Sequence, residues 1–360
     1  MKEKQLIING RTESVLYAGS GLGEFVRKIS GMPSSSIHVI ADRNAIAPTE
    51  SILPDFFKRI SSGLPPICLE ADERNKTLAE AERICLELEK RGADRDSLLV
   101  VVGGGITTDL GGFVASVYRR GIKAVFIPTT LLAQADAAIG GKNGVNLGGH
   151  KNMIGTIRQP AAVYLCGDYI REMPHGLLMD GLSEMLKIFM ITSPSDYEKV
   201  CGIFSDGDFP VKSDTGHFFE LVYSAAKEKM DIVAEDQFEH GRRELLNLGH
   251  TFAHAVESVT GGTVSHGRAV AEGMLLAAKA GVVMGATSPD FLYKIENDFE
   301  KCGITGTKIE YGRPSDLLPH MLVDKKKHAD GIHLIVPKAL GDVAGVSVNK
   351  NGLEKILSLI

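Results

Sequence analysis

The stretch that most constrains the fold of this chain is LLVVVGGGITTDLGG, residues 98–112. Five consecutive apolar residues, 98–102, predict a buried strand. Three glycines follow, and apolar residues then recur at helical spacing from Leu110, so we expect a helix to begin at Thr107 or Thr108. A backbone without Cβ atoms lets a ligand approach closely, and the first N–H groups of a helix point at an anion. The pattern therefore favours a phosphate or nucleotide site over a plain tight turn, although Thr108 replaces the last glycine of a GxGxxG fingerprint.

Composition and charge exclude several classes of protein. The 360 residues carry a net charge of −5, which argues against a nucleic-acid partner. No apolar run reaches the length of a membrane helix, and the first ten residues lack the apolar stretch of a signal peptide. Five scattered cysteines fit reduced thiols and not a disulfide framework. We therefore expect a cytoplasmic enzyme.

The order of predicted elements divides the chain into two domains. Strand patterns at 14–19, 37–42, 66–71, 97–102 and 123–128 alternate with helical patterns at 50–61 and 77–91. This alternation predicts an N-terminal α/β nucleotide-binding domain, residues 1–170, with a mostly parallel sheet. For residues 171–360 we expect a mainly helical domain, which would carry the metal site considered below, with helices at 181–191, 218–234, 244–259, 269–284 and 289–302 and a short β segment at 333–348.

Polar residues follow several of the predicted strands, at the edge of a parallel sheet where ligands bind. They are Asp42 and Asn44, then Asp72, Glu73 and Lys76, then Thr129 and Thr130. Each set is compatible with ordinary turn or capping chemistry, but with the glycine loop they indicate a nucleotide crevice. Asp42 precedes that loop, whereas the dinucleotide fold places its acid after it, so the order is not that of a standard Rossmann domain.

Residues 131–160 form a glycine-rich stretch that we expect to be an irregular functional loop. It carries Asp136, Lys142, Asn146, Lys151 and Asn152. Two lysines on such a loop suit an anionic ligand, and the alternative is that they are solvated surface residues.

A polar series interrupts one of the predicted C-terminal helices. Arg243, Asn247, His250 and His254 are spaced so that one helix would place them on one stripe. Thr251 stands where an HExxH motif needs glutamate, so the metalloprotease interpretation fails. With Glu184 and His266, which lie elsewhere in the sequence, the imidazoles could form a catalytic metal site of one carboxylate and two histidines. The alternative is a set of capping or solvated histidines.

Several segments together resemble the 3-dehydroquinate synthases, within the sugar-phosphate cyclase family. They are GGGITTDLGGFVASVYRRG, FIPTTLLAQADAAIGGKNGVN, KNMIG, SEMLK, LLNLGHTFAHAVE, HGRAVAEGM and DKK, which follow one another between about residues 42 and 326. The resemblance implies a lyase of the shikimate pathway, which leads to chorismate and the aromatic amino acids. Such an enzyme converts 3-deoxy-D-arabino-heptulosonate 7-phosphate to 3-dehydroquinate and phosphate, with NAD regenerated in each turnover and a divalent metal, zinc or cobalt.

The resemblance also implies roles for individual residues. The metal ligands are Glu184, His250 and His266. The NAD site comprises Asp42, Asn44, Glu73, Lys76, Gly104, Gly105, Asp109, Thr129 and Thr130, together with Lys142 and Lys151. Catalytic residues are Lys142, Lys187, Lys229, Arg243, Asn247 and His254. Substrate contacts are Asp136, Lys142, Lys151, Asn152, Lys229, Arg243, Asn247, His254, Lys325 and Lys326. Arg120 reaches the phosphate bound by a neighbouring subunit, which implies a homodimer.

The chain departs from the family pattern near the expected metal site. These positions include Glu172, Gly176, Leu177, Ala253 and Arg268. They affect the expected detail of substrate binding more than the reaction class. The competing interpretations are another sugar-phosphate cyclase, a metal-dependent alcohol or glycerol dehydrogenase that releases NADH, and a non-catalytic relative.

Overall fold

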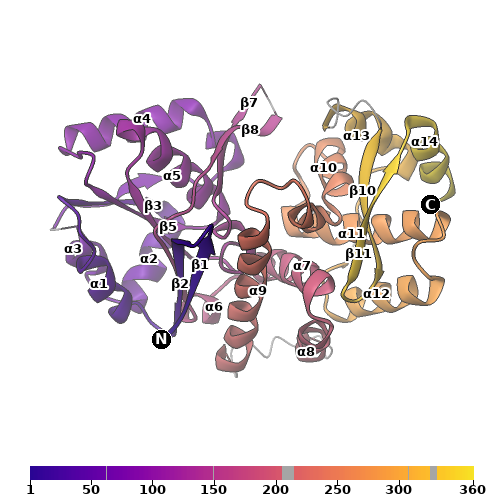
Figure 1. Ribbon diagram of the computed structural model, residues 1–360, viewed down its shortest axis with the longest axis horizontal. Coiled ribbons are helices and arrows are strands. Elements are labelled where there is room, and N and C mark those ends of the chain that lie inside the picture. The colour runs from indigo at the N-terminus through magenta and orange to yellow at the C-terminus, as the bar shows by residue number, and fades with distance from the viewer. Residues whose placement is uncertain (62, 149, 205–214, 307, 325–330) are drawn as a thin grey trace. The chain divides into compact units, whose positions relative to one another are not determined.

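The computed structural model describes the chain except for residues 62, 149, 205–214, 307 and 325–330. It contains two compact units: Met1–Pro174 with Val211–Gln237, and His175–Pro210 with Phe238–Ile360 (Figure 1). The predicted single boundary at residue 170 is therefore wrong for the helix α9 (Thr215–Glu235), which belongs to the first unit. The reason is packing, because Ala226, Met230 and Val233 of α9 share a hydrophobic core with the sheet of that unit. The Lys325–Lys326 pair lies outside the described residues.

The first unit is built on a seven-stranded sheet in the order β1-β2-β9-β6-β5-β3-β4. Only β1 and β2 pair antiparallel, and the other neighbouring strands are parallel. The strands are β1 (Lys2–Ile8), β2 (Arg11–Gly19), β3 (Ile37–Asp42), β4 (Ile67–Leu69), β5 (Leu98–Gly103), β6 (Lys123–Pro128) and β9 (Ala162–Cys166). The predicted α/β class with a mostly parallel sheet is confirmed.

Helices cover both faces of this sheet, and β5 shows why its sequence is apolar throughout. Leu99 and Val101 contribute to one core and Val100 and Val102 to the other, all without exposed surface. A strand buried on both faces needs an unbroken apolar run. The helices of this unit are α1 (Gly23–Ser30), α2 (Arg43–Ile52), α3 (Phe56–Ile60), α4 (Leu78–Lys90), α5 (Gly105–Val117), α6 (Asp168–Arg171) and α9, with short turns η1 (Glu73–Asn75), η2 (Tyr118–Arg120) and the π-helical η3 (Ala133–Ala137).

Several local predictions differ from the structure: the helix expected at 50–61 is instead the end of α2 and the separate helix α3. The helix after the glycine loop, α5, begins at Gly105 and not at Thr107 or Thr108. The stretch expected to be an irregular loop contains η3 and an antiparallel hairpin, β7 (Lys142–Leu147) and β8 (His150–Ile157). The glycines of this stretch obscured the hairpin because they break the alternation that indicates a strand.

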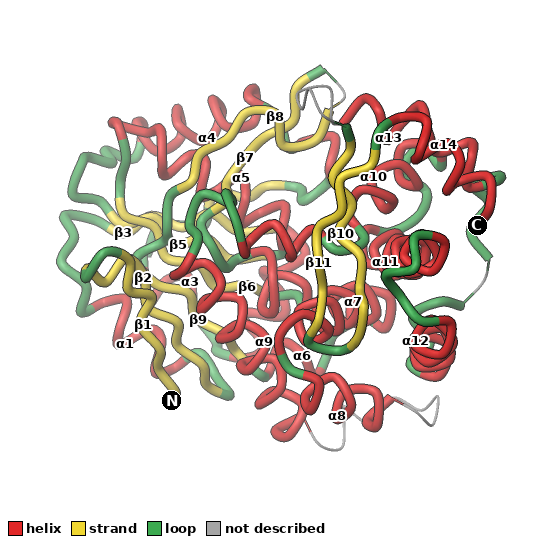
Figure 2. The backbone as a smooth tube through the Cα atoms, turned by 45° about the vertical axis from the view of Figure 1, so that its right-hand side comes forward, coloured by secondary structure: helices red, strands yellow, loops and turns green. Residues whose placement is uncertain are grey.

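The second unit is mainly helical, with one antiparallel hairpin, β10 (Ile332–Ala339) and β11 (Asp342–Val348). This hairpin runs beside α11 and α7 (Figure 2). The helices are α7 (His175–Thr192), α8 (Pro194–Phe204), α10 (His250–Val259), α11 (His266–Val283), α12 (Pro289–Lys301), α13 (Leu318–Asp324) and α14 (Lys350–Leu359), with turns η5 (Arg242–Asn247) and η6 (Pro314–Leu317).

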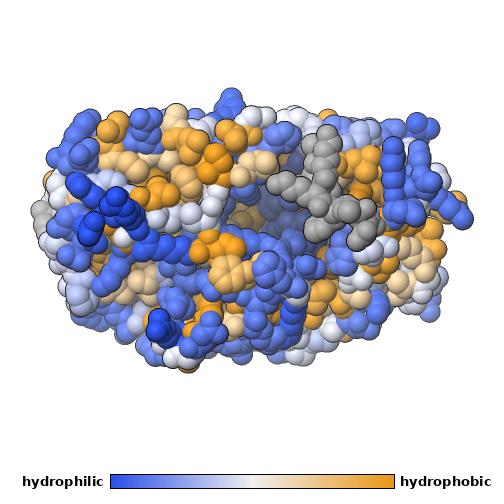
Figure 3. All heavy atoms as spheres, turned by 45° about the horizontal axis from the view of Figure 1, so that its top comes forward, coloured by the Kyte–Doolittle hydropathy of each residue, from blue (hydrophilic) through white to orange (hydrophobic). Residues whose placement is uncertain are grey.

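Among the described residues, no helix combines the length and apolar character that a membrane span requires. On the face shown in Figure 3, hydrophobic residues lie in small groups among hydrophilic ones.

Candidate functional site

The first group of predicted site residues lies at the carboxyl edge of the parallel sheet, and we call it the sheet-edge cluster. Its members are Asp42, Glu73, Lys76, Gly104, Gly105, Asp109, Thr129, Thr130, Asn146 and Asn152. The strand register explains the grouping, since Gly103 pairs with Pro128, and Asp42 with Leu69. In the sheet, β4 lies on one side of β3, and the next strand in the chain, β5, lies on its other side. Asp42 and the glycine loop therefore flank the topological switch point, where open α/β sheets bind ligands.

The glycine loop is packed so closely that side chains have no room there. A Cβ at Gly103 would lie 2.6 Å from atoms of Thr107, and one at Gly104 would lie 3.2 Å from Thr130. The loop carbonyl of Gly103 accepts from the N–H of Thr129 at 2.9 Å, which joins the ends of β5 and β6. The first N–H groups of α5 have no acceptor within the helix, so they are available to an anion.

Asp42 is held at the start of α2 by its own turn. Its carboxylate accepts from the N–H of Asn44 at 3.1 Å. Burial raises the pKa of Asp42 despite that bond. A carboxylate placed this way can accept from hydroxyl groups of a ligand while it caps the helix.

A buried lysine joins three segments of the sheet-edge cluster. Lys76 is 3% exposed, and its Nζ donates to Asp109 Oδ2 and to Asn152 Oδ1, both at 2.5 Å. Burial raises the pKa of Asp109, and the opposing effect of Lys76 does not cancel it. The hairpin is anchored in the same place, because Asn146 Nδ2 donates to Glu73 Oε1 at 2.8 Å. These contacts join residues that the sequence separates by up to 76 positions.

A second buried ion pair lies in the same unit. Lys229 of α9 donates to the backbone carbonyl of Asp136 at 2.8 Å and contacts the carboxylate of the same residue. Asp136 is part of the π-helical η3, a form frequent at functional sites. Lys142 and Lys151, on the two strands of the hairpin, are exposed.

Glycines at helix contacts allow the second group of site residues to come together. A Cβ at Gly267 of α11 would lie 2.2 Å from Cα of Asp180 in α7. A Cβ at Gly273, one to two turns further on, would lie 2.2 Å from the carbonyl oxygen of Gly249, which precedes α10. Small residues at both contacts let α7 and α10 approach α11 closely. Glu184, His250 and His266, one from each helix, therefore converge.

We call this group the helical cluster: Glu184, Lys187, His250, Glu257 and His266. Glu184 Oε1 lies 3.1 Å from His266 Nε2 and 3.6 Å from His250 Nε2. Lys187 Nζ lies 2.6 Å from the other oxygen of Glu184. The potential ligand atoms of Glu184, His250 and His266 all lie within 4.8 Å of one another. One carboxylate and two imidazoles at these separations can hold a zinc-like ion and leave a position open.

The electrostatics of the helical cluster differ between its two histidines. Burial and the neighbouring Lys187 lower the pKa of His250 to about 3, so this ring is neutral at neutral pH. Burial also disfavours the charged form of His266, but hydrogen bonds to Glu184 and Glu257 prevail and raise its pKa to about 10. Burial would raise the pKa of Glu184, but Lys187 and the two histidines hold it well below its usual range.

The predicted single stripe of Arg243, Asn247, His250 and His254 is wrong. The first two lie on the 3-10 turn η5, and α10 begins only at His250. Gly249 separates the two elements with φ +80°, a left-handed conformation that glycine adopts without strain. His250 and His254 do share a helix, with ring centroids 5.6 Å apart and the His254 side chain exposed.

Arg243 is 1% exposed and therefore belongs to the interior of the second unit. Asn247 donates through Nδ2 to Glu239 Oε1 at 2.6 Å. Sequence reasoning missed Glu239, a non-glycine residue at φ +62° eight positions before Asn247. It also missed Glu257, which follows His254 by three residues on α10 and so shares its side of the helix.

Positions that depart from the family pattern lie in different surroundings. Glu172, Gly176 and Leu177 are exposed at the end of α6 and the start of α7. Ala253 is fully buried on α10, and Arg268 is half-buried on α11. The three potential metal ligands lie together in this chain with these departures present.

Arg120 lies on η2, apart from the sheet-edge contacts described above. It is exposed, and both it and Arg119 have left-handed backbones, with φ +67° and +52°. Non-glycine residues rarely adopt the left-handed backbone conformation, and those that do cluster at functional sites.

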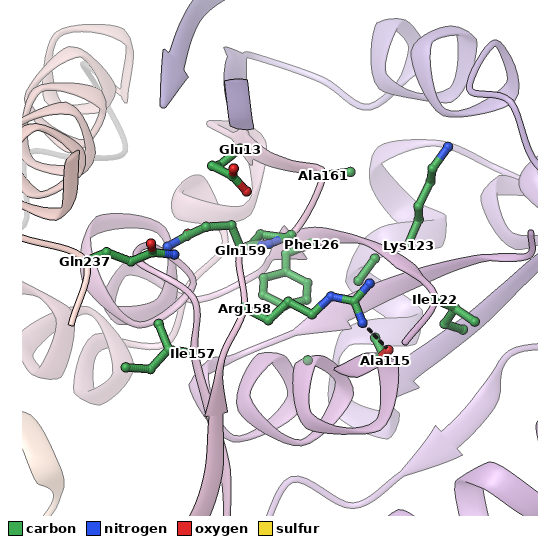
Figure 4. A pocket seen from close by; sticks show the side chains of 13 residues that line it. Glu13, Ala115, Ile122, Lys123, Phe126, Ile157, Arg158, Gln159, Ala161 and Gln237 are labelled. Atoms are coloured by element: carbon green, nitrogen blue, oxygen red, sulfur yellow. Dashed lines mark hydrogen bonds between the residues drawn. The ribbon is translucent and has the colours of Figure 1, made fainter. Parts of the chain in front are cut away.

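A separate cavity of about 310 Å³ lies in the first unit (Figure 4). In it the Arg158 guanidinium donates to the carbonyl of Ala115 at 3.2 Å. None of the predicted site residues lines this cavity. The residue chemistry at the sheet edge and among the helices, and not the size of this cavity, therefore locates the candidate sites.

Two family models match the chain in succession: 3-dehydroquinate synthase N-terminal over residues 66–179 and 3-dehydroquinate synthase C-terminal over residues 181–327. The chain is 33% identical to the 3-dehydroquinate synthase of Blochmanniella floridana over 97% of its own length and 96% of the relative. Its fold is similar to that of 2-deoxy-scyllo-inosose synthase complexed with carbaglucose-6-phosphate, NAD+ and Co2+, with TM-score 0.85, 22% identity and 99% coverage of both chains. It is also similar to 2-epi-5-epi-valiolone synthase of Streptomyces hygroscopicus subsp. jinggangensis 5008 with NAD+ and Zn2+ bound, with TM-score 0.80, 23% identity and 95% coverage of both chains.

Proposed function

The chain belongs to the 3-dehydroquinate synthase family, and from that premise we propose which of its residues perform the reaction. The reaction is conversion of 3-deoxy-D-arabino-heptulosonate 7-phosphate to 3-dehydroquinate and phosphate, in the shikimate pathway. The observation that carries the proposal is the convergence of Glu184, His250 and His266 within a chain that matches both family models.

The helical cluster is the proposed metal site. Its donor set, one carboxylate oxygen and two imidazole nitrogens, suits zinc or cobalt. A divalent ion held there supplies a Lewis acid that lowers the pKa of a substrate hydroxyl. Glu184 is ionised and His250 is neutral at neutral pH, so both are in the form that binds a metal.

The sheet-edge cluster is the proposed NAD site. The N–H groups at the start of α5 suit the pyrophosphate, and the Asp42 carboxylate suits the hydroxyls of a ribose. NAD held there would supply a reversible hydride acceptor, so it would be catalytic and not consumed. The remaining proposed cofactor residues are Asn44, Glu73, Lys76, Asp109, Thr129, Thr130, Lys142 and Lys151.

Positive side chains and amides are proposed to hold the substrate's phosphate and carboxylate. Charged donors bind such anions through short hydrogen bonds and stabilise negative charge that develops during elimination. The proposed set is Lys142, Lys151, Asn152, Lys187, Lys229, Arg243, Asn247 and His254, with Asp136 as the partner of Lys229.

We also propose that the enzyme acts in the cytoplasm as a homodimer. Arg120 supports the homodimer, because it is exposed on a constrained turn and is therefore accessible to a neighbouring subunit. Sedimentation of the purified protein tests it: a single species at the mass of two chains is expected, and a species at the mass of one chain contradicts it.

The experiment that tests the function follows phosphate release and absorbance at 340 nm in parallel. The protein receives zinc, 3-deoxy-D-arabino-heptulosonate 7-phosphate and less than one equivalent of NAD. Many phosphates released per NAD without NADH accumulation is the expected result. NADH accumulation without phosphate release identifies a dehydrogenase instead, and neither signal rejects this substrate.

A further inference from the structure

His266 lies between two carboxylates that approach opposite nitrogens of its ring. Glu184 Oε1 is 3.1 Å from Nε2, and Glu257 Oε1 is 3.1 Å from Nδ1. Glu257 is only 7% exposed. It comes from α10, whereas His266 is the first residue of α11, so the contact spans two helices.

This arrangement fixes which nitrogen can bind a metal. A carboxylate accepts a hydrogen bond, so the proton of a neutral His266 belongs on Nδ1, opposite Glu257. Nε2, which faces Glu184, is then left with its lone pair for a metal. An anionic acceptor behind the ring also increases the basicity of the coordinating nitrogen.

The other histidine of the cluster is held differently. Nδ1 of His250 lies 3.3 Å from the backbone carbonyl oxygen of Leu248, a neutral acceptor at a longer distance. His250 is the first residue of α10, so the helix itself fixes its backbone. Of the two histidines, only His266 therefore has an anionic hydrogen-bond partner on the ring nitrogen that faces away from Glu184.

We propose that Glu257 is a positioning residue, which orients His266 for coordination through Nε2 and raises the affinity of the site for a divalent metal. This inference rests on the proposed metal site of the helical cluster. Glu257 acts through His266 and does not contact the metal. Partners of this kind typically change metal affinity by about 10–100-fold.

The test compares metal affinity in the intact wild-type chain and in Glu257→Gln and Glu257→Ala, each first stripped of metal. Zinc affinity is measured by competition with a chromophoric chelator, and the visible absorption spectrum of the cobalt form reports the ligand environment. We expect affinity to fall about 10–100-fold in Glu257→Ala, with shifted cobalt bands. Glu257→Gln keeps a neutral acceptor oxygen, so its affinity is expected between those of wild type and Glu257→Ala.

A matched control is available on α11. Glu272 accepts from the Tyr311 hydroxyl at 2.7 Å, and its carboxylate is not among the groups that shift the pKa of His266, His250 or Glu184. Glu272→Gln removes a similar charge in the same unit, and its zinc affinity and cobalt spectrum should match wild type. Thermal unfolding of all variants in excess chelator separates loss of metal from loss of fold.

The outcomes distinguish this inference from the proposed function. If the wild-type chain binds neither zinc nor cobalt, the proposed metal site fails. If wild type binds them and both Glu257 variants bind equally well with unchanged cobalt spectra, the proposed role of Glu257 is overturned and the metal site stands. If Glu257→Ala does not fold, Glu257→Gln decides: reduced affinity supports the role, and unchanged affinity with an unchanged spectrum overturns it.

Discussion

The sheet-edge cluster and the helical cluster balance their charges in different ways. In the first unit, Lys76 pairs with Asp109, and Lys229 pairs with Asp136. In the helical cluster, two carboxylates share one protonated imidazole, and Lys187 pairs with Glu184. The first unit thus balances these charges with lysine–carboxylate pairs alone, whereas the helical cluster combines one such pair with a proton at His266.

This difference indicates which cluster is suited to bind a metal cation. A metal at Asp109 would have to displace Lys76 and leave a buried charge unpaired, whereas Glu184 keeps Lys187 on one oxygen and turns its other oxygen toward the two histidines. A proton held between a carboxylate and an imidazole can be replaced by a metal, because both groups become ligands when the proton leaves. The helical cluster is therefore the one suited to a metal ion, whereas the lysine–carboxylate pairs of the first unit balance their charges without one.

The strongest way to break this comparison is to remove a ligand from the helical cluster alone. We expect His250→Ala to lose zinc and activity together, by at least about a thousandfold, since Lewis-acid stabilisation is worth several kcal/mol. NAD binding by the first unit should be unchanged. Metal content and phosphate release are the measurements, with His320→Ala as control because His320 bonds to Ser258 and not to the cluster. Full activity of His250→Ala at limiting zinc excludes His250 as a ligand.

The next test removes one member of a sheet-edge pair. Lys76→Met leaves the Asp109 carboxyl buried without its ammonium, and we expect the free energy of unfolding to fall by about 3 kcal/mol. Urea unfolding measures this. The control is Lys90→Met, whose pair with Glu87 is exposed, so a change of no more than about 0.5 kcal/mol is expected. If Lys76→Met loses zinc as well as stability, the separation of the two clusters is wrong.

The two clusters also differ in how far sequence reasoning could reach them. Strand β5 was predictable because burial on both faces demands an apolar run, and the Gly-rich turn followed at once. The edge strand β1 was missed because polar residues interrupt its apolar pattern, and its pairing with β2 decides its structure. Although β1 was missed, the predicted ends of the parallel strands were enough to indicate the carboxyl edge of the sheet.

The helical cluster could not be derived in that way. Its three potential ligands come from three helices, and their convergence depends on close contacts at Gly267 and Gly273 that no spacing encodes. The ligand set came from the family resemblance. The single helical stripe predicted for Arg243 to His254 does not exist, because a left-handed glycine, Gly249, separates η5 from α10. Glu257 was missed because its contact with His266 forms only where α10 meets α11, and the sequence does not show where the two helices meet.

A third prediction tests whether helix contact creates the cluster. Gly273→Ala places a Cβ 2.2 Å from the Gly249 carbonyl oxygen, so α10 and α11 must separate. We expect a loss of about 2 kcal/mol in stability and weaker zinc binding, measured by thermal unfolding and chelator competition. Gly176→Ala is the control, because a Cβ there has no heavy atom within 4 Å. Unchanged zinc affinity in a destabilised Gly273→Ala shows that the ligands do not depend on this contact.

The smallest effect concerns the proton that the metal replaces. The pKa of His266 is raised from 6.5 to about 10, so in the metal-free protein this ring stays charged near neutral pH, while His250, with a pKa of about 3, stays neutral. The His266 proton stabilises the metal-free fold fully below pH 6.5, and this contribution is lost as the pH rises through about 10. Zinc must displace that proton, so its affinity should rise about tenfold per pH unit between about pH 6.5 and 8.5, with about one proton released per zinc. Calorimetry in buffers of different ionisation enthalpy measures the release. A value near zero means that His266 is not a ligand, whereas a value near two means that a second group of the helical cluster also loses a proton.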